Sequence, residues 1–325
     1  MSLVGIAAGA VLAFAWISIK TYDRLSGRNF LLDLRDKARM GLRNVDAWDH
    51  FWANNPRRSE IVICLTTLPS RLPEIEGTLK SLLYQSYAPA AIRLHLPKVS
   101  RREGVAYEVP DWLRALSSVE LVECDKDYGP ATKFIPALLE CPPAQPLLIV
   151  DDDKLYPPDL VAHFDALATE HPETALGSSG WNVPEDLQDR KVTLLGTLRG
   201  EAPGRRKSTQ LRSAEPIDIL QGHSGYLLRP RFFDMQDFLA SYTDGPEEAF
   251  FNDDIWMSGH CRVPKMIFPN RRFCFVSWRR VRLYDRTSLE RRESDADVQV
   301  RTNTVLIRHL SDRWLAFGPR NPPTE

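Results

Sequence analysis

The chain has 325 residues, of which 43% are hydrophobic and 26% charged, with a formal net charge of -1. This composition is typical of a globular protein with enough apolar material for a sizeable core. The near-zero charge argues against a nucleic-acid partner, since nucleic-acid binders depend on neutralising phosphates. None of the five cysteines forms a CxxC pair, so neither a disulfide framework nor a zinc site is indicated.

The N-terminal segment is the first predicted element. Leu3 to Ile19 is an uncharged run of 17 residues, and a helix of roughly that length is the shortest that spans a bilayer. A single-pass membrane anchor is therefore predicted over residues 1–20. The alternative interpretation of this segment is a buried helix of a soluble domain. Basic residues follow the run and none precedes it: Lys20, Arg24, Arg28, Arg35, Lys37, Arg39 and Arg43. This bias predicts that the body of the protein lies on the cytoplasmic side; a Golgi-lumen orientation is the alternative.

The rest of the chain divides into a helical stalk (21–58), one large α/β domain (59–318) and a short tail (319–325). Buried strands are predicted from continuous apolar runs, with helical patterns at 73–83 and 132–139 between them. The predicted strands are 61–65, 91–96, 119–124 and 146–150, with further strand character at 217–228 and 266–278. Strands that alternate with helices predict a mainly parallel sheet flanked by helices, whose ligands bind beyond the carboxyl ends of the strands. A polar, basic loop over that site is predicted at 185–215.

Three adjacent carboxylates end the strand 146–150: Asp151, Asp152 and Asp153. Their mutual repulsion needs compensation, and a hard divalent cation such as Mg²⁺ or Mn²⁺ prefers oxygen ligands of this kind. Strand alternation is expected to point Asp151 and Asp153 to one side and Asp152 to the other. A solvated acidic turn is the alternative interpretation.

A second acidic pair, Asp253 and Asp254, lies between aromatic residues at the expected start of a helix. Apolar neighbours raise the pKa of a carboxyl group, which suits a general base. Capping of the helix by Asn252 or Asp253 is the structural alternative, and both roles can hold at once.

Four further candidate site residues lie outside these two acidic motifs. Asp127 begins a Gly-Pro turn that leads to Lys133, whose ammonium is placed to meet a phosphate near a helix start. His309 is a candidate metal ligand, with a structural histidine as the alternative. His223 lies on a glycine-flanked turn that would allow a sugar to approach closely.

Taken together, these motifs resemble those of the GT-A glycosyltransferases, in the family 2-like and exostosin-like group. The resemblance covers roughly residues 60 to 310 and rests on four motifs in the right order. They are Thr66 to Arg71 after the first strand, Asp127 to Lys133, Asp151 to Asp153, and Asp253 to Ile255.

The resemblance implies a metal-dependent transfer of sugar from a UDP-, GDP- or dTDP-sugar to an acceptor. We expect a glycan or lipid-linked acceptor in envelope or cell-surface polysaccharide synthesis, because a membrane anchor would raise the rate at which the enzyme meets such substrates. The resemblance places the nucleotide at Thr67 and Arg71, the ribose or metal at Asp151 and the metal at Asp153. Asp254 matches the catalytic base of inverting members. The chain departs from the family at Asp253, where Glu is usual, so the stereochemical outcome stays open.

Two other functions remain as alternatives. A nucleotidyltransferase would share the architecture and the metal aspartates, but the loop after the first strand has no glycine. A non-catalytic glycan-binding or scaffold protein on a degenerate transferase fold would be expected to lack the metal aspartates or the second acidic pair, and both are present.

Overall fold

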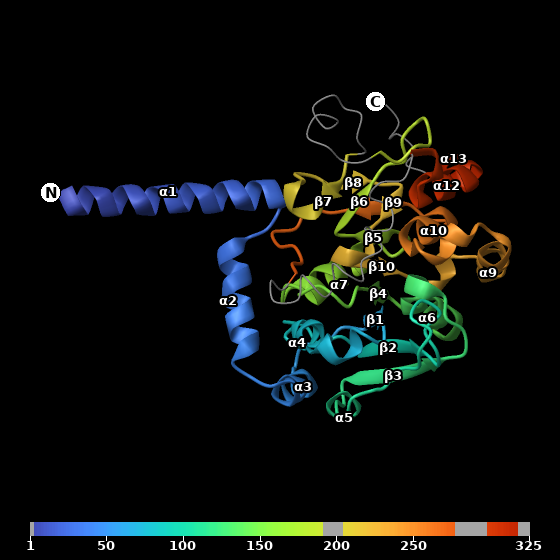
Figure 1. Ribbon diagram of the computed structural model, residues 1–325, viewed down its shortest axis with the longest axis horizontal. Helices are drawn as coiled ribbons and strands as arrows, with labels where there is room; N and C mark the ends of the chain where they lie inside the picture. Colours follow the sequence, from blue (N-terminus) through green and yellow to red (C-terminus); the bar gives the residue numbers. More distant parts are fainter. Residues whose placement is uncertain (1–2, 191–203, 277–297, 318–325) are drawn as a thin grey trace.

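A computed structural model describes residues 3–190, 204–276 and 298–317. Eight strands form the central sheet, and three short strands form a second one beside it (Figure 1). In spatial order the large sheet contains β3 (Val119–Cys124), β2 (Ala91–Pro97), β1 (Val62–Thr66), β4 (Leu147–Ile149), β10 (Tyr226–Leu228), β5 (Ala175–Gly177), β11 (Lys265–Ile267) and β8 (Glu215–Pro216). The small sheet contains β7 (Arg206–Lys207), β6 (Ser179–Trp181) and β9 (Ile219–Leu220).

The predicted α/β class with a mainly parallel sheet is confirmed. Four neighbouring strands are parallel, in the order β3, β2, β1 and β4. The next strand, β10, lies between β4 and β5 and runs antiparallel to both. Therefore β5, and β11 parallel to it, run in the same direction as β4. Only β10 and β8 among the eight strands run the other way. The carboxyl ends of β1 and β4 therefore meet at one edge of the sheet, which is the edge where ligands bind in such folds.

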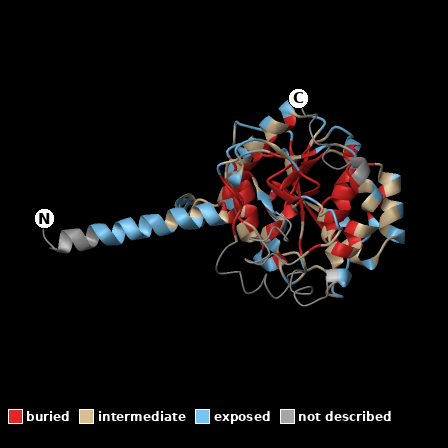
Figure 2. Cartoon of the chain, turned by 90° about the horizontal axis from the view of Figure 1, so that it is seen from above, coloured by how far each residue is buried: buried red, intermediate tan, exposed pale blue. Residues whose placement is uncertain are grey.

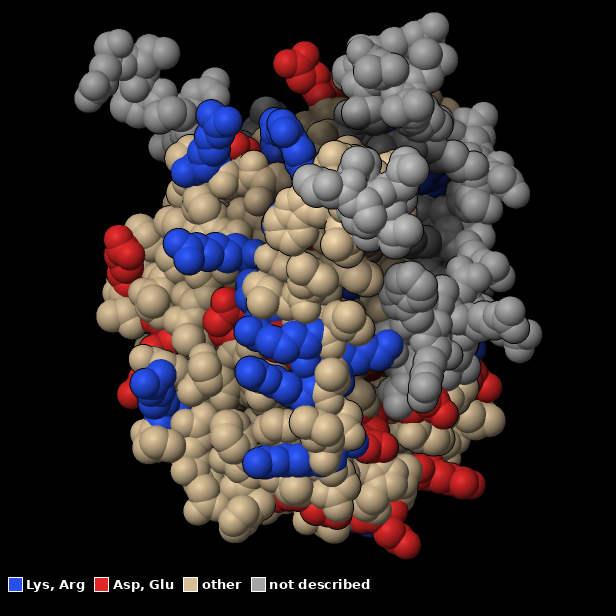
Figure 3. Space-filling view, turned by 90° about the vertical axis from the view of Figure 1, so that its left-hand side faces the viewer, with Lys and Arg blue, Asp and Glu red and all other residues tan. Residues whose placement is uncertain are grey.

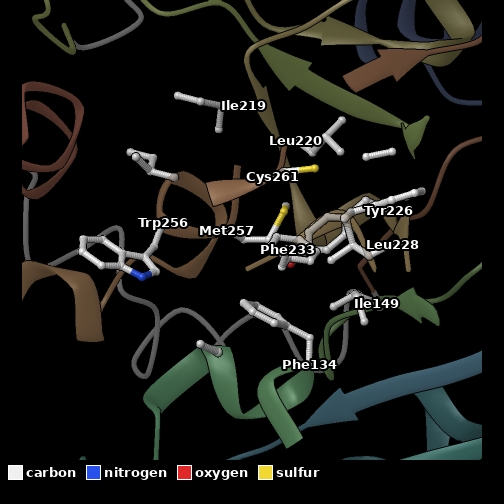
Figure 4. Close-up of a cluster of buried hydrophobic side chains, with 14 of the residues drawn as sticks. Phe134, Ile149, Ile219, Leu220, Tyr226, Leu228, Phe233, Trp256, Met257 and Cys261 are labelled. Carbon is white, nitrogen blue, oxygen red and sulfur yellow. The ribbon is translucent and has the colours of Figure 1, made fainter. Parts of the chain in front are cut away.

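Alternation along the strands divides the core into two halves. In β1, Ile63 and Leu65 pack on one face of the sheet, whereas Val62 and Cys64 pack on the other. Both faces of the sheet are covered, and buried residues fill the body of the molecule (Figure 2). The half that lies next to α10 contains large side chains from several elements (Figure 4): Phe134, Ile149, Tyr226, Phe233 and Trp256.

The helices connect and cover the strands. They are α1 (Leu3–Ser26), α2 (Phe30–Gly41), α3 (Val45–Ala53), α4 (Glu76–Leu83), α5 (Asp111–Arg114), α6 (Ile135–Glu140), α7 (Leu160–Glu170), α9 (Met235–Asp244), α10 (Asp253–His260), α12 (Thr302–His309) and α13 (Ser311–Phe317). Short 3-10 helices precede several of them, including η1 (Leu72–Glu74), η2 (Gly129–Lys133) and η6 (Glu247–Phe250), and another, η4 (Gly222–Ser224), precedes β10.

The predicted membrane anchor is corrected by the structure. Residues 3–19 are helical, as expected, but they belong to α1, which continues to Ser26 and projects from the body (Figure 1). Within the described part of the chain, no helix has both the length and the apolar character needed to cross a membrane. The apolar run stops at Ile19 because Lys20, Asp23 and Arg24 follow on the same helix. The transmembrane helix and the membrane localisation derived from it are therefore wrong.

The α2 and α3 part of the predicted stalk, residues 21–58, packs on the body of the protein. Asp49 of α3 accepts hydrogen bonds from the backbone N–H groups of Ser117 (3.0 Å) and Ser118 (2.9 Å) at the start of β3. Asp36 of α2 forms a buried ion pair with Arg272. Lys and Arg side chains gather on the face from which α1 projects (Figure 3). Residues 191–203 of the predicted polar, basic loop and all of the predicted tail, 319–325, lie outside the described residues.

Candidate active site

The acidic motifs lie in a cavity of about 820 Å³ at the carboxyl edge of β1 and β4. The loop after β1, the triplet after β4, the η2 turn and the start of α10 all contribute to its walls. The predicted site residues that line it are Thr67, Arg71, Asp127, Lys133, Asp151, Asp152, Asp153, Asp253 and Asp254. The structure thus brings together all of the predicted site residues except His309.

Lys133 joins the two acidic motifs. Its Nζ lies 2.7 Å from Oδ1 of Asp151 and 2.8 Å from Oδ2 of Asp253, and its side chain is only 5% exposed. Burial alone would lower the pKa of Lys133, but the two carboxylates outweigh it and raise that pKa well above its usual value. Burial would likewise raise the pKa of Asp151, but Lys133 more than offsets this and lowers it. A charged ammonium therefore holds the end of β4 against the start of α10.

Asp254 is in a different environment. Its Oδ1 accepts a hydrogen bond of 3.0 Å from the backbone N–H of Gly222, and no ion pair to it is found among the described residues. Burial first, and then the adjacent Asp253, raise the pKa of Asp254 well above its usual value. Asn252 caps α10, since its side chain accepts the N–H of Ile255 at 3.1 Å. The cap therefore leaves Asp254 free to face the cavity.

Asp152 connects the triplet to the loop after β1. Its carboxylate accepts the hydroxyl of Thr67 at 2.6 Å and the guanidinium of Arg71 at 2.9 Å. Its backbone carbonyl accepts the hydroxyl of Thr78 at 2.6 Å. Thr67 and Arg71, which were predicted to hold a nucleotide, are thus also the residues that fix Asp152 in place.

Asp153 pairs with its neighbour Lys154, with Nζ and Oδ1 2.6 Å apart. Burial would lower the pKa of Lys154, but Asp153 outweighs this and raises it. The negative charge of the three carboxylates was expected to be compensated by a metal ion. In this structure Lys133, Arg71 and Lys154 each pair with one of the three and compensate it.

The donor set fits a divalent cation in type. Asp151 and Asp153 both face the cavity, their side chains are 30% and 20% exposed, and carboxylate oxygens are the ligands that Mg²⁺ and Mn²⁺ prefer. Within the described residues, however, no group of three or more His, Cys, Asp or Glu side chains is arranged to hold a metal ion. These two aspartates would therefore need further ligands from outside the protein, such as the oxygens of a diphosphate.

Asp127 has a structural role in the turn that leads to Lys133. One carboxylate oxygen accepts the N–H of Gly129 and the other accepts the N–H of Arg101, both at 2.7 Å. Gly129 adopts a φ of +61°, a left-handed conformation that favours glycine. The predicted helix from Thr132 begins as the 3-10 turn η2 and becomes α6 only after Phe134.

His309 does not reach the cavity. It is exposed on α12, and its ring stacks on Trp256 with centroids 5.8 Å apart and an interplanar angle of 18°. Conversely, the cavity is lined by residues that the sequence analysis did not single out, among them Arg102, Tyr107, Trp181, Arg301 and Asn303. They come from loops and distant elements and belong to no motif, so the sequence offered no signal for them.

Comparison with known proteins adds only distant structural likeness. No protein-family model matches the chain, and neither does any curated protein. A crystal structure of S. aureus TarS residues 1–349 in complex with UDP is 15% identical, with a TM-score of 0.41 over 79% of this chain and 72% of that one. A mannosyltransferase from Pyrobaculum calidifontis, PcManGT, in complex with GDP-Man and Mn²⁺ is 16% identical, with a TM-score of 0.38 over 88% of this chain and 78% of that one. Likeness at this level does not by itself decide the function.

Proposed function

We propose that this chain is a GT-A-type glycosyltransferase that moves a sugar from a nucleotide-sugar donor to a hydroxyl group of a glycan acceptor. The observation that carries the proposal is the meeting of two acidic motifs around Lys133 in one cavity, at the carboxyl edge of a mainly parallel sheet. The motif after β4 suits the diphosphate end of the donor, and Asp254 suits the acceptor hydroxyl. Residues 59–318 would form the catalytic domain.

Different residues of the chain would serve the leaving group and the acceptor hydroxyl. Lys133 and Arg71 present buried or half-buried positive charge to the cavity, which favours a diphosphate leaving group. Asp254 has the raised pKa and the cavity-facing position of a general base, and the N–H of Gly222 holds its carboxylate in one orientation. Asp254 would accept the proton of the acceptor hydroxyl as that oxygen attacks the anomeric carbon, if the reaction inverts configuration.

Mn²⁺ or Mg²⁺ is the cofactor that the donor set suits, held by Asp151 and Asp153. When bound, such an ion supplies Lewis-acid stabilisation of the negative charge on the departing diphosphate. The ion pairs Asp151–Lys133 and Asp153–Lys154 would keep these two carboxylates apart and oriented in its absence. The proposed acceptor is a glycan, because a lipid-linked acceptor was expected only from the membrane anchor, which the structure does not support.

Nucleotide titration tests the proposal. UDP, GDP, CDP and dTDP are titrated calorimetrically against the full chain, each with and without Mn²⁺, and against Asp153→Asn. The expected result is metal-dependent binding of one nucleotide that weakens at least about tenfold in Asp153→Asn, the loss of one charged ligand. If none of the nucleotides binds under either condition, the transferase proposal is wrong.

A further inference from the structure

Three polar side chains, Asp189, Asn303 and Asn252, form a hydrogen-bonded bridge that ends at the start of α10. All three line the cavity. Nδ2 of Asn252 donates to Oδ1 of Asn303 at 2.5 Å, and Nδ2 of Asn303 donates to Oδ2 of Asp189 at 2.9 Å. Asn303 lies 51 residues from Asn252 and 114 residues from Asp189 along the chain, so no local sequence pattern indicates this bridge.

The two ends of the bridge fix the direction of its hydrogen bonds. At one end the backbone N–H of Ile255 can only donate, and it donates to Oδ1 of Asn252 at 3.1 Å. At the other end the carboxylate of Asp189 can only accept, so the amide nitrogen of Asn303 has to face it. Each of the two amides between these ends then has one orientation that satisfies both of its neighbours. Without the Asp189 carboxylate, Asn303 would be free to turn its oxygen away from Asn252.

Asp189 is itself held on α12. Its carboxylate pairs with the guanidinium of Arg301 at 3.2 Å, and both side chains are largely buried. Its backbone N–H donates to the hydroxyl of the buried Thr304 at 3.0 Å. The helix α12 lies beside α10 (Figure 1). Asp189 is therefore a fixed point from which the position of the α10 cap can be set.

The residues that follow the cap are the two carboxylates of the second acidic motif. Asp253 pairs with Lys133, and Asp254 accepts the N–H of Gly222. These contacts orient the two side chains, whereas the bridge holds the backbone from which they project. Displacement of a catalytic group by about 1 Å is enough to impair its reaction, so the position of this backbone matters for catalysis.

We propose that Asp189 is a positioning residue for the proposed base Asp254, and that it acts through Asn303 and Asn252. The inference rests on the proposed function for the role of Asp254, whereas the bridge belongs to the fold. Asp189 also lines the cavity, so the competing role is a direct contact with a substrate.

A reciprocal exchange of side chains tests the bridge. Asn303→Asp alone places a second carboxylate against Asp189 and removes the donor between them. Asp189→Asn combined with Asn303→Asp supplies a donor again, because the new amide at position 189 can donate to the carboxylate at position 303. The other oxygen of that carboxylate can still accept from Asn252, and the amide oxygen at position 189 can accept from Arg301.

Two single variants complete the set. Asp189→Ala removes the acceptor at the end of the bridge but keeps the backbone hydrogen bond to Thr304, so the fold should be retained. Asp312→Ala is the matched control, because Asp312 is exposed on α13 and does not line the cavity.

NMR of the full chain provides a measurement that needs no substrate. Hydrogen exchange of the Ile255 amide reports the cap, and the chemical shift of the Gly222 amide reports the position of the Asp254 carboxylate that accepts it. Exchange at Ile255 should be about fivefold faster in Asp189→Ala and in Asn303→Asp, as the loss of one hydrogen bond predicts, and the Gly222 shift should move. Both should return to wild-type values in the double variant and stay unchanged in Asp312→Ala.

Kinetics with the nucleotide sugar that the chain uses provide the second measurement. Asp189→Ala should lower kcat about tenfold, because the base is displaced, while the Kd of the nucleotide stays within about twofold. The double variant should recover kcat.

Unchanged Ile255 exchange in Asp189→Ala would overturn the inference. A lower kcat with unchanged Ile255 and Gly222 amides would also overturn it, because Asp189 would then contact the substrate directly. So would a double variant as impaired as Asn303→Asp. If Asn303→Asp does not fold, the comparison of Asp189→Ala with the wild type decides alone. Absence of transferase activity in the wild type would contradict the proposed function only, because the amide measurements need no substrate.

Discussion

The ammonium nitrogen of Lys133 lies 2.7 Å from Oδ1 of Asp151, and this pair ties η2 to the end of β4. The same ammonium reaches Asp253 at 2.8 Å, so one buried cation serves two carboxylates from different elements. Its removal would leave the half-buried Asp151 and the buried Asp253 without their counter-charge.

Lys133→Met is therefore expected to lower the free energy of unfolding by about 3–5 kcal/mol, the usual cost of removing one partner from a buried ion pair. Urea denaturation followed by circular dichroism measures it. Lys98→Met is the control, because Lys98 is 59% exposed and its pairs with Glu123 and Asp125 are solvated. Equal stability of Lys133→Met and Lys98→Met would contradict the structural role assigned to Lys133.

Asp254→Asn is expected to lower kcat by about 10²–10⁴-fold, the usual contribution of a general base, if the enzyme inverts. The amide oxygen of the variant can still accept the N–H of Gly222, so the fold and the nucleotide affinity should be retained. Asp244→Asn, at an exposed position of α9, is the matched control. A variant with unchanged kcat would remove Asp254 from the mechanism.

The raised pKa of Asp254 gives a pH dependence. A base must be ionised to act, so kcat/KM should rise with pH through the raised pKa of Asp254 and then level off. The free energy of unfolding should change with pH in the opposite direction to kcat/KM. A carboxyl group whose pKa is higher in the folded state than in the unfolded state stabilises the fold while protonated, and that contribution is lost as pH rises through the folded pKa.

The stability effect can be measured without a substrate. The free energy of unfolding of the wild type should fall relative to that of Asp254→Asn as the pH is raised from about 4 through the raised pKa. A difference between the two proteins that does not change with pH would show that the pKa of Asp254 is not raised.

Gly222 is expected to tolerate no side chain. A Cβ at this position would lie 2.7 Å from Nζ of Lys133 and 3.1 Å from Oδ1 of Asp254, so one of these groups would have to move. Gly222→Ala should lower kcat at least about tenfold, because displacement of a catalytic group by a fraction of an ångström already impairs its geometry. Gly41→Ala, where a Cβ would meet nothing within 4 Å, is the control. Full activity of Gly222→Ala would mean that the cavity is less rigid than described.

Metal affinity should depend on the nucleotide. Because the described residues hold no cluster of three or more metal-ligating side chains, Mn²⁺ alone should bind weakly, and the nucleotide should tighten its binding at least about tenfold by completing the ligand shell. Electron paramagnetic resonance of free Mn²⁺, with and without the nucleotide, measures this. Tight binding to the nucleotide-free protein would contradict it.

The strands could be predicted because their sequences carry a strong local pattern. The apolar run before Asp151 contains β4, which is buried on both faces of the mainly parallel sheet. Such a strand can be predicted from its own residues once the fold class is known. The same pattern placed the acidic triplet at the edge where ligands bind, and the aromatic setting of Asp254 indicated its raised pKa.

Other features depend on contacts between distant segments. The phosphate contact predicted for Lys133 stays a prediction, whereas its ion pairs with Asp151 and Asp253 were not indicated by the sequence, because these partners lie 18 and 120 residues away along the chain. The ring of His309 packs on Trp256 of another helix, which no local pattern indicated. The anchor prediction relied on the length of an apolar run, and that run is part of a longer helix with charged residues in its second half.

Release of nucleoside diphosphate from nucleotide sugars by the full chain tests the proposed transferase activity directly. UDP-, GDP- and dTDP-sugars are incubated with Mn²⁺ and a mixture of neutral methyl glycosides, and the released diphosphate is quantified for the wild type, Asp153→Asn and Asp254→Asn. The wild type is expected to consume one nucleotide sugar and form a glycosylated product, and both variants are expected to lose this activity. No release from any donor, or equal release by the wild type and both variants, would contradict the proposed activity.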